Sequence, residues 1–311
     1  MLVARSVIES GSGRMEWAVA FAPRMRISIV QRRGLVLDTR YVPAAPQPAS
    51  GNPCLYLVRN GTLRWQAAGA EHATTGPTAL VVSQEHLEGG DGRRSLTYQT
   101  DAEHFTLIEI HLDEQDTLLR AGPDPIPVSL GEHEWSLVER VCALGTHDDE
   151  SLIAAITRLL DALAQLAFLS PGVAVSAARP DSPMFRLLWR ALRPIAENLD
   201  LLTTVRQIGD AIDATPHEVD TYVRKFLAAS GLVGAKWRPA SRHLRLKMAV
   251  IMLSADDTSA AEVACVIGYG SADAMLRAFR DAGLPSPGAV RTALRANATR
   301  GGEVAPAPAT R

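Results

Sequence analysis

Hydrophobic and polar positions follow two different periods along the chain. Up to about residue 112, apolar residues alternate with polar ones over short runs that Gly, Pro and Asn separate, which is the pattern of β-strands. Because no helical pattern interrupts these runs, they favour an antiparallel barrel or a sandwich. The candidate strands cover residues 15–21, 25–30, 35–39, 55–59, 63–66, 79–83, 96–100 and 105–112.

The dipeptide Asn60-Gly61 stands between two of these runs. Both central positions of a two-residue hairpin turn need a positive φ, which Asn and Gly tolerate. We therefore predict a hairpin that pairs the strands on either side. Tyr56, Arg64 and Trp65 flank this turn and are candidates for lining an effector pocket, although packing in the core or exposure on the surface is the favoured explanation.

Beyond a Pro-rich stretch at 123–127, apolar residues recur every three or four positions, which predicts helices over 134–144 and 152–169. Residues 170–182 are rich in Pro, Ala and Ser and predict a loop. The second helix carries an apolar stripe wide enough to pack on the β region and on a second copy of the chain, so we expect it to dimerise the protein. The stripe consists of Leu152, Ile156, Leu159, Leu160, Leu163 and Leu166.

From Ser182 the pattern is helical to about residue 296. Ser182-Pro183 predicts a helix start, because Ser suits the N-cap and Pro suits the first helical position. A second start is predicted at Thr215, where Glu218 completes a capping box after a short helix over 205–212. The helix that follows presents His217, Thr221, Arg224 and Lys225 outward.

A similar pair of helices is predicted near the end of the chain. A capping box begins near Thr258, Gly268 and Gly270 mark a turn, and Ser271 can cap the next helix. Met275 and Phe279 form its buried face, which leaves Asp273, Arg277 and Arg280 outward. Arg side chains on a helix after a tight turn suit the DNA major groove, and capped helix starts suit phosphates.

The last of these segments resembles a known family. Ser259–Ser271, Met275 and Phe279, and then Ser286-Pro287 with Arg291 are similar to the second half of the DNA-binding domain of AraC/XylS transcriptional regulators. The first half departs from that pattern, because Thr215 stands where the family has Ser and the stretch 227–242 is several residues longer. The resemblance implies DNA contacts from Asp273 and Arg277, and a cupin-like N-terminal domain that senses an effector.

The resemblance and the periodicity together predict an α+β multidomain protein. Its expected parts are a β-rich, cupin-like β-barrel sensing domain over 1–130, a helical dimerisation segment and linker over 131–181, an all-α domain with two helix-turn-helix units over 182–300, and a disordered tail over 301–311. Nine residues are the predicted DNA contacts: Thr215, His217, Thr221, Arg224, Lys225, Ser271, Asp273, Arg277 and Arg280.

Charge supports this division. The 311-residue chain carries a formal net charge of −2, which by itself argues against a nucleic-acid partner. Residues 201–311, however, hold 14 Lys and Arg against 10 Asp and Glu, a net of +4, whereas residues 1–200 hold 18 against 24, a net of −6. A modestly basic module therefore follows an acidic one, which is consistent with DNA binding by the second.

Other classes of protein find little support. Three distant cysteines have no metal-ligand spacing and predict reduced thiols in a cytosol. No export signal or transmembrane run is expected. Glu109 and His111, with His104 near them, could bind a metal in a cupin barrel, but His-x-His is absent, so no metal or cofactor is predicted.

The sequence thus predicts a cytoplasmic DNA-binding regulator and not an enzyme. Its expected partners are double-stranded DNA, a small-molecule effector, a second copy of the chain and RNA polymerase, with no membrane. Two alternatives remain open: a cupin-type enzyme with a helical appendage, and a regulator whose β region serves only assembly.

Overall fold

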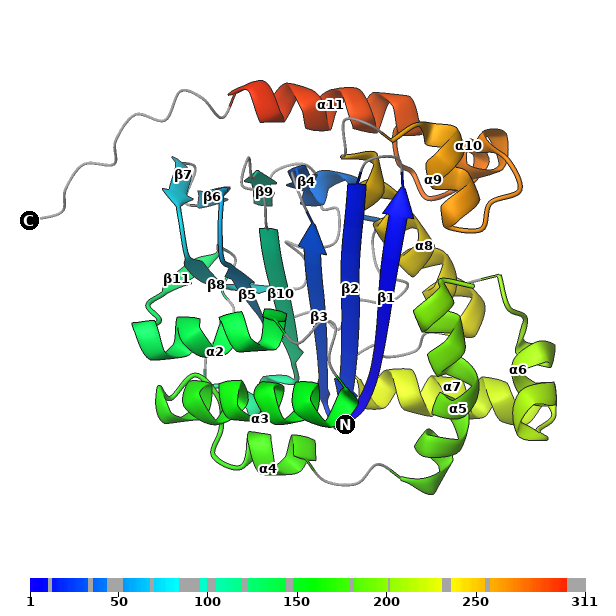
Figure 1. Cartoon of the computed structure of the whole chain (residues 1–311), viewed down its shortest axis with the longest axis horizontal. Helices are drawn as coiled ribbons and strands as arrows, with labels where there is room; N and C mark the ends of the chain where they lie inside the picture. Colours follow the sequence, from blue (N-terminus) through cyan, green and yellow to red (C-terminus); the bar gives the residue numbers. More distant parts are fainter. Residues whose placement is uncertain are drawn as a thin grey trace, which may run out of the picture.

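The computed structural model describes residues 1–10, 13–32, 36–43, 53–67, 70–83, 96–99, 105–118, 122, 124–143, 148–178, 182–200, 202–230, 236–254 and 258–300. Two predictions fall outside these residues: the disordered tail 301–311 and the place of His104. The antiparallel β region comes first along the chain and an all-helical region follows it, which confirms the predicted class (Figure 1).

The described strands form two antiparallel sheets. Three strands escaped the sequence prediction: β1, β7 and β11. The larger sheet has seven strands in the order β1 (Leu2–Ser10), β2 (Gly13–Ala22), β3 (Met25–Arg32), β10 (Phe105–Leu112), β5 (Pro53–Val58), β8 (Thr78–Ser83) and β11 (Ile126–Val128). The smaller sheet has four, in the order β4 (Val36–Asp38), β9 (Leu96–Gln99), β6 (Thr62–Ala67) and β7 (Ala70–Thr75).

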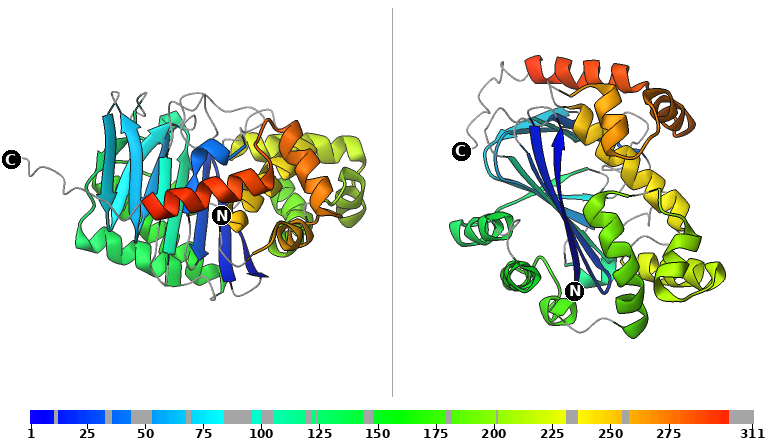
Figure 2. Two further views of the ribbon diagram at one scale, coloured as in Figure 1. Left: turned by 90° about the horizontal axis from the view of Figure 1, so that it is seen from above. Right: turned by 45° about the vertical axis from the view of Figure 1, so that its right-hand side comes forward.

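Both faces of the seven-stranded sheet are covered, as the right view of Figure 2 shows. Alternation along β2 separates the two cores, because Ala18 and Ala20 face one side and Trp17 and Val19 face the other. Helices α2, α3 and α4 cover the first side. The second side is shared between the four-stranded sheet and the C-terminal helices, which belong to one continuous hydrophobic cluster.

The central strands β5 and β8 are buried on both faces, so their sequences Pro-Cys-Leu-Tyr-Leu-Val and Thr-Ala-Leu-Val-Val-Ser are apolar almost throughout. Two sheets packed face to face form a sandwich, which is one of the two architectures that the strand pattern predicted.

The predicted hairpin at Asn60-Gly61 is wrong. Gly61 does turn the chain with a φ of 106°, but β5 pairs with β8 and β10 while β6 pairs with β7 and β9. The turn therefore carries the chain from one sheet to the other. Local sequence specifies the turn, whereas burial on both faces of β5 decides which strands it pairs with.

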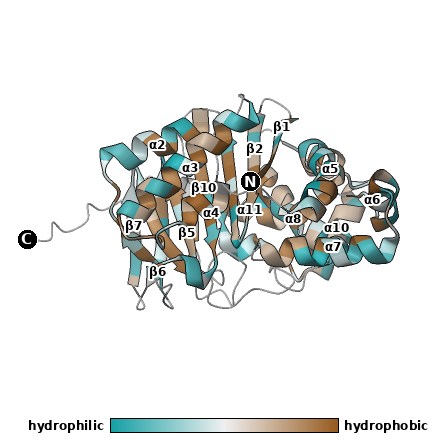
Figure 3. Cartoon of the chain, turned by 90° about the horizontal axis from the view of Figure 1, so that it is seen from below, coloured by the Kyte–Doolittle hydropathy of each residue, from teal (hydrophilic) through white to brown (hydrophobic). Residues whose placement is uncertain are grey.

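Helices α2 (Glu132–Ala143) and α3 (Asp149–Gln165) lie across the sheet, with hydrophilic residues outward (Figure 3). The apolar stripe of α3 packs on the sheet as predicted, and Leu152, Leu160 and Leu163 are fully buried there. Leu166, at the C-cap of α3, is the one stripe residue that stays exposed, at 39%, so most of the predicted dimer surface is used inside the chain. Helix α4 (Val173–Ala178) lies in the stretch predicted as a loop, held by Val173, Ala174 and Ala177 against the same core.

The C-terminal helices pack on the edge of the sheet next to β1, and α11 lies across the end near β4 (Figure 1). None of the described helices is long and apolar enough to cross a membrane. Their bounds are α5 Pro183–Asn198, α6 Val205–Ile212, α7 Pro216–Ala229, α8 Trp237–Leu253, α9 Ala260–Val266, α10 Ala272–Asp281 and α11 Pro287–Arg300, with the short 3-10 helices Thr39–Tyr41 and Glu114–Asp116 in the β region.

Candidate nucleic-acid interface and interdomain cavity

Helices α6 and α7 form a tight pair joined by three residues. Ile208 and Ile212 of α6 pack on Val219 and Val223 of α7, and all four are buried. Gly209 lies at the closest approach, because a Cβ there would come 2.4 Å from a carbonyl oxygen of the turn. Only glycine fits at this position without moving the backbone, so the angle between the two helices is fixed by the sequence.

The start of α7 is closed by the predicted capping box. The Thr215 hydroxyl accepts from the Glu218 backbone N–H at 3.3 Å and donates to the Glu218 carboxylate at 2.7 Å. The Thr215 backbone N–H donates to the same carboxylate at 2.8 Å, and the bonds from this hydroxyl and this N–H lower the pKa of Glu218. Because the Thr215 hydroxyl proton is used inside the protein, the residue is placed to orient the helix start.

One face of α7 carries the other predicted contacts of this pair. His217, Arg224 and Lys225 are exposed, and Thr221 is half-buried with its hydroxyl donating to the His217 carbonyl at 3.0 Å. Spacings of four, seven and eight residues from His217 place the four on one side of the helix. The structure therefore brings these predicted residues together.

Helices α9 and α10 form the second pair. Ser259 and Glu262 make a capping box at the start of α9, and Gly268 turns the chain with a φ of 76°. The Ser271 hydroxyl then accepts from the Ala274 N–H at 3.1 Å and caps α10. Capping boxes and glycine turns are local features, which is why the sequence located both starts.

The face of α10 away from the core shows Asp273, Arg277 and Arg280, all exposed and spaced four and three residues apart. Met275 and Phe279 are fully buried on the opposite face. Two cations and one carboxylate thus lie on this face of α10, and Asp281 at its end is a second exposed carboxylate.

Helix α8 joins the two pairs, and Arg245 attaches the second pair to it. The Arg245 guanidinium donates to the carbonyls of Ile267 and Gly268 at 3.2 Å each and lies 3.8 Å from the ring centroid of Tyr269. These contacts hold the glycine turn of the second pair against α8. Arg245 therefore has a structural role at the base of this pair.

A cavity of about 140 Å³ lies between the seven-stranded sheet and helices α5, α7 and α8. Its walls are mostly apolar and aromatic, with a few polar groups at the α8 side. The sheet contributes Trp17, Val19, Phe21 and Val30, and the helices contribute Trp189, Leu192, Phe226, Trp237, Met248 and Ile251; the polar residues are Arg26, Ser28, Glu109, Ser241, His243 and Lys247.

The polar end of the cavity holds an ion pair between the two regions of the chain. Lys247 Nζ on α8 donates to Glu109 Oε2 on β10 at 2.6 Å, and the His111 Nε2 atom lies 3.5 Å from the same oxygen. The side chains of Glu109 and Lys247 are 4% and 18% exposed, so this is an almost dry contact. Glu109 was the carboxylate of the alternative metal site, and here it is paired with Lys247.

Burial and the neighbouring charges shift both titrating groups on β10. Burial alone would raise the pKa of Glu109, but the neighbouring charge of Lys247 outweighs it and holds that pKa well below its usual range. Burial and then the Arg26 charge lower the pKa of His111 to about 4. At neutral pH the pair is therefore ionised and His111 is neutral.

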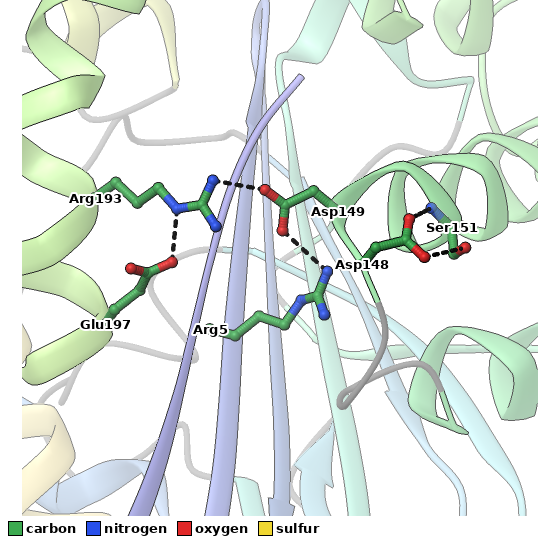
Figure 4. A network of polar contacts seen from close by, with 6 residues as sticks. All are labelled: Arg5, Asp148, Asp149, Ser151, Arg193 and Glu197. Carbon is green, nitrogen blue, oxygen red and sulfur yellow. Dashed lines mark hydrogen bonds and ion pairs between the residues drawn. The ribbon is translucent and has the colours of Figure 1, made fainter.

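A second polar contact between the regions surrounds Asp149 at the start of α3 (Figure 4). Its carboxylate accepts from Arg5 of β1 at 3.0 Å and from Arg193 of α5 at 2.6 Å, and Arg193 also pairs with Glu197 at 2.6 Å. A backbone contact adds to these, because the Arg24 N–H donates to the Ala229 carbonyl at the end of α7. These contacts tie two helices of the C-terminal region, α5 by way of Asp149 and α7 directly, to the β region.

The predicted effector residues lie away from this cavity. Tyr56 is fully buried in the core between the sheets, and Trp65 is nearly so, stacked on His72 with ring centroids 5.5 Å apart. Arg64 points to the other face of its strand and lies 3.6 Å from Glu71. The structure therefore does not gather the three around one cavity among the described residues.

Sequence reasoning missed the residues that make the cavity polar at one end. Lys247 has no motif around it, and Trp189 and Trp237 lie on different helices. The sequence signal for this site was a lysine within the apolar run Leu246 to Ile251, because a buried charge requires a partner of opposite charge.

No protein-family model and no curated protein sequence matches the chain. Among solved structures, an apo variant of ToxT from Vibrio cholerae is 9% identical, with a TM-score of 0.38, over 87% of this chain and 98% of its own. Wild-type ToxT from the same bacterium with a bound unsaturated fatty acid is 8% identical, at 0.34, over 91% and 96%.

CuxR, described as an AraC-like transcriptional activator, is 15% identical with a TM-score of 0.31, over 79% of this chain and 85% of its own. It carries the family name that the sequence resemblance predicts. At TM-scores below 0.5, the likeness of these backbones does not by itself establish a shared function.

Proposed function

We propose that this chain is a DNA-binding transcriptional regulator of the AraC/XylS type, in which α7 and α10 are recognition helices. The observation that carries the proposal is the repeated pair: each of these helices follows a turn, begins at a capped Thr or Ser, and has basic side chains on its exposed face. This is how a helix-turn-helix unit presents itself to the major groove.

The spacing of the two units supports binding to neighbouring grooves. Helix α8 has 17 residues and is about 26 Å long at 1.5 Å per residue. One turn of B-DNA measures about 34 Å, and α8 connects the two units, with α10 packed beside its first half through the hydrogen bond from Arg242 to the Ala278 carbonyl. We therefore propose that the two units read successive major grooves on one side of the duplex.

Selection of bound duplexes from a random pool tests this function. We expect enrichment of two short conserved segments whose centres lie about 10 base pairs apart, with affinity that falls as salt rises. No enrichment and no salt-dependent binding would refute the proposal. A metal assay on the same preparation addresses the rival cupin-type enzyme, which requires a bound metal.

We also propose that the interdomain cavity binds a small-molecule effector. Ligand sites are concave, mostly apolar and carry few polar groups, as this cavity does. Its volume of about 140 Å³ is close to that of an engineered 150 Å³ cavity that binds benzene, so a compact molecule fits without rearrangement.

Its position supports regulation of the DNA-binding region. Walls from the sheet and from α5, α7 and α8 mean that a ligand contacts both regions at once. A ligand that fits one relative placement better than another shifts the population toward it. Because α7 is a wall of the cavity and a proposed recognition helix, that shift would change the affinity for DNA.

A cavity-filling variant tests the effector site. Val19→Phe adds a ring to the wall on β2, whereas Val7→Phe makes the same change at a position on β1 that is 49% exposed. In a thermal-shift screen of compact apolar compounds, we expect a compound that raises the Tm of the wild type and of Val7→Phe but not of Val19→Phe. Equal shifts in all three proteins would place the effector elsewhere.

We further propose a cytoplasmic homodimer, with RNA polymerase as a candidate partner on DNA. The expected α3 stripe is buried inside the chain apart from Leu166, so we expect the contact to use mainly another surface. Sedimentation equilibrium across the micromolar range, with and without a selected duplex, tests the dimer. A single species of monomer mass in both conditions would refute it.

A further inference from the structure

A groove lies between the two helix pairs, next to the proposed recognition face of α10. We call it the inter-unit groove, and its volume is about 750 Å³. Three elements form its walls: the start of α6 with Thr204, the first half of α8 with Arg238 and Arg242, and one side of α10 with Arg277. The start of α6 and one side of α10 both lie beside the first half of α8, so the groove spans the gap between the two units there.

The inter-unit groove is strongly positive. Four arginines and one carboxylate, Asp281, line it, which gives a formal charge of +3. Two of these arginines are committed inside the protein: Arg245 holds the turn of the second pair, and Arg242 donates to the Ala278 carbonyl and lies 3.7 Å from Asp281.

Arg238 and Arg277 are the cations that remain for a ligand. Both are exposed, and no described residue forms an ion pair with either. They stand on different walls, one on α8 and the other on α10. Two unpaired guanidiniums across a positive groove are suited to an anion with several oxygens, because guanidinium binds phosphate by paired hydrogen bonds.

The end of α6 adds to this potential. Thr204 caps α6, no acidic residue lies in its first turn, and the positive end of the helix dipole faces the groove. The Trp237 indole donates to the Thr203 carbonyl at 2.6 Å and fixes this helix start against α8. The groove is therefore built on fixed walls.

We infer that the inter-unit groove holds the sugar-phosphate backbone of DNA where it passes from one major groove to the next. This rests on the proposed function. The connecting observation is Arg277, which belongs both to the recognition face of α10 and to the wall of the groove. A duplex read by α10 thus brings its backbone to Arg238, and charge complementarity favours that contact over a neutral partner.

Salt dependence of DNA binding tests the inference. A side chain that neutralises one phosphate contributes about 0.9 to the slope of log affinity against log salt. We expect Arg238→Ala to lower that slope by about one, equally for a selected and a random duplex, and Arg238→Lys to keep it. The control Arg158→Ala removes an exposed arginine from α3, on the opposite side of the sheet, and should keep the wild-type slope.

The outcomes separate this inference from the proposed function. If the wild type binds no duplex in a salt-dependent way, both fail. If the wild type binds DNA but Arg238→Ala keeps the slope of Arg158→Ala, the inference alone is overturned. Calorimetry with inorganic phosphate tests whether the groove binds a free anion instead. Suppose that phosphate binds with submillimolar affinity, that Arg238→Ala abolishes this binding, and that the salt slope of DNA binding is unchanged in the same variant. The groove would then be assigned to a free anion and the DNA contact overturned.

Discussion

The ion pair between Lys247 and Glu109 joins the helical region to the sheet, and its two partners should not be equivalent. At 2.6 Å and an effective dielectric constant of about 20, their gross attraction is about 6 kcal/mol. Removing both ions from water costs several kcal/mol each, so the intact pair contributes little net stability. Breaking the pair by removing one partner, however, leaves a buried charge and costs about 3–5 kcal/mol.

The exposures of the two side chains set the direction of the asymmetry. Glu109 is 4% exposed and Lys247 is 18% exposed. Lys247→Met therefore strands the more deeply buried ion and should lower the free energy of unfolding by about 3 kcal/mol at pH 7. Glu109→Gln leaves a lysine that can reach water and should cost about half as much. The double variant should cost about as much as Glu109→Gln alone.

Lowering the pH adds a second, independent check on Lys247→Met. In the wild type the pKa of Glu109 lies below its unfolded value, so its stabilising effect is complete above that unfolded value and is lost as the pH falls below it. Without Lys247, burial raises the folded pKa of Glu109, so the folded state gains a proton as the pH falls. The cost of Lys247→Met should therefore shrink between pH 7 and pH 5.

Urea unfolding followed by far-ultraviolet circular dichroism measures all four proteins at both values of pH. Lys225→Met is the matched control, because Lys225 is exposed on α7 and its loss should change stability by less than about 0.5 kcal/mol. Additive costs in the double variant, or a larger cost for Glu109→Gln than for Lys247→Met, would refute the reasoning.

Three further predictions follow from individual side chains. Burial lowers the pKa of His111 to about 4, so the unfolded state binds more protons between pH 4 and 6.5 and stability should fall as the pH drops through that range; His111→Gln should flatten the fall in urea titrations, and the exposed His133→Gln should not. Gly209→Ala should destabilise the first helix pair by about 1–3 kcal/mol, seen as a lower Tm, because its Cβ would meet backbone at 2.4 Å; an unchanged Tm would contradict that contact. Arg224→Ala and Arg277→Ala should each weaken binding by about 1–3 kcal/mol at one base pair of a selected site, and undiminished discrimination in both would contradict the proposed recognition faces.

Local interactions made much of the helical region predictable from the sequence. The cap at Ser182, the capping box at Thr215 and the turn at Gly268 depend on residues no more than four positions apart, and the structure confirms all three. The exposed faces of α7 and α10 followed from the same spacing, because the buried residues of each helix leave a definite opposite side.

Contacts between distant parts of the chain were not predictable in this way. The turn at Asn60-Gly61 was read correctly as a turn and wrongly as a hairpin, since pairing depends on which strands lie beside β5. Helix α4 was missed because it is six residues long and is held mainly by the core beneath it.

The sequence alone determined where the chain turns, where its helices begin and which residues those helices expose, because these features depend on neighbours along the backbone. Only the tertiary structure decided that most of the α3 stripe is buried against the chain's own sheet. It also decided that a lysine of α8 pairs with a glutamate 138 residues away beside an apolar cavity. Both outcomes depend on which surfaces of distant segments pack against each other, and a local sequence pattern does not specify that packing.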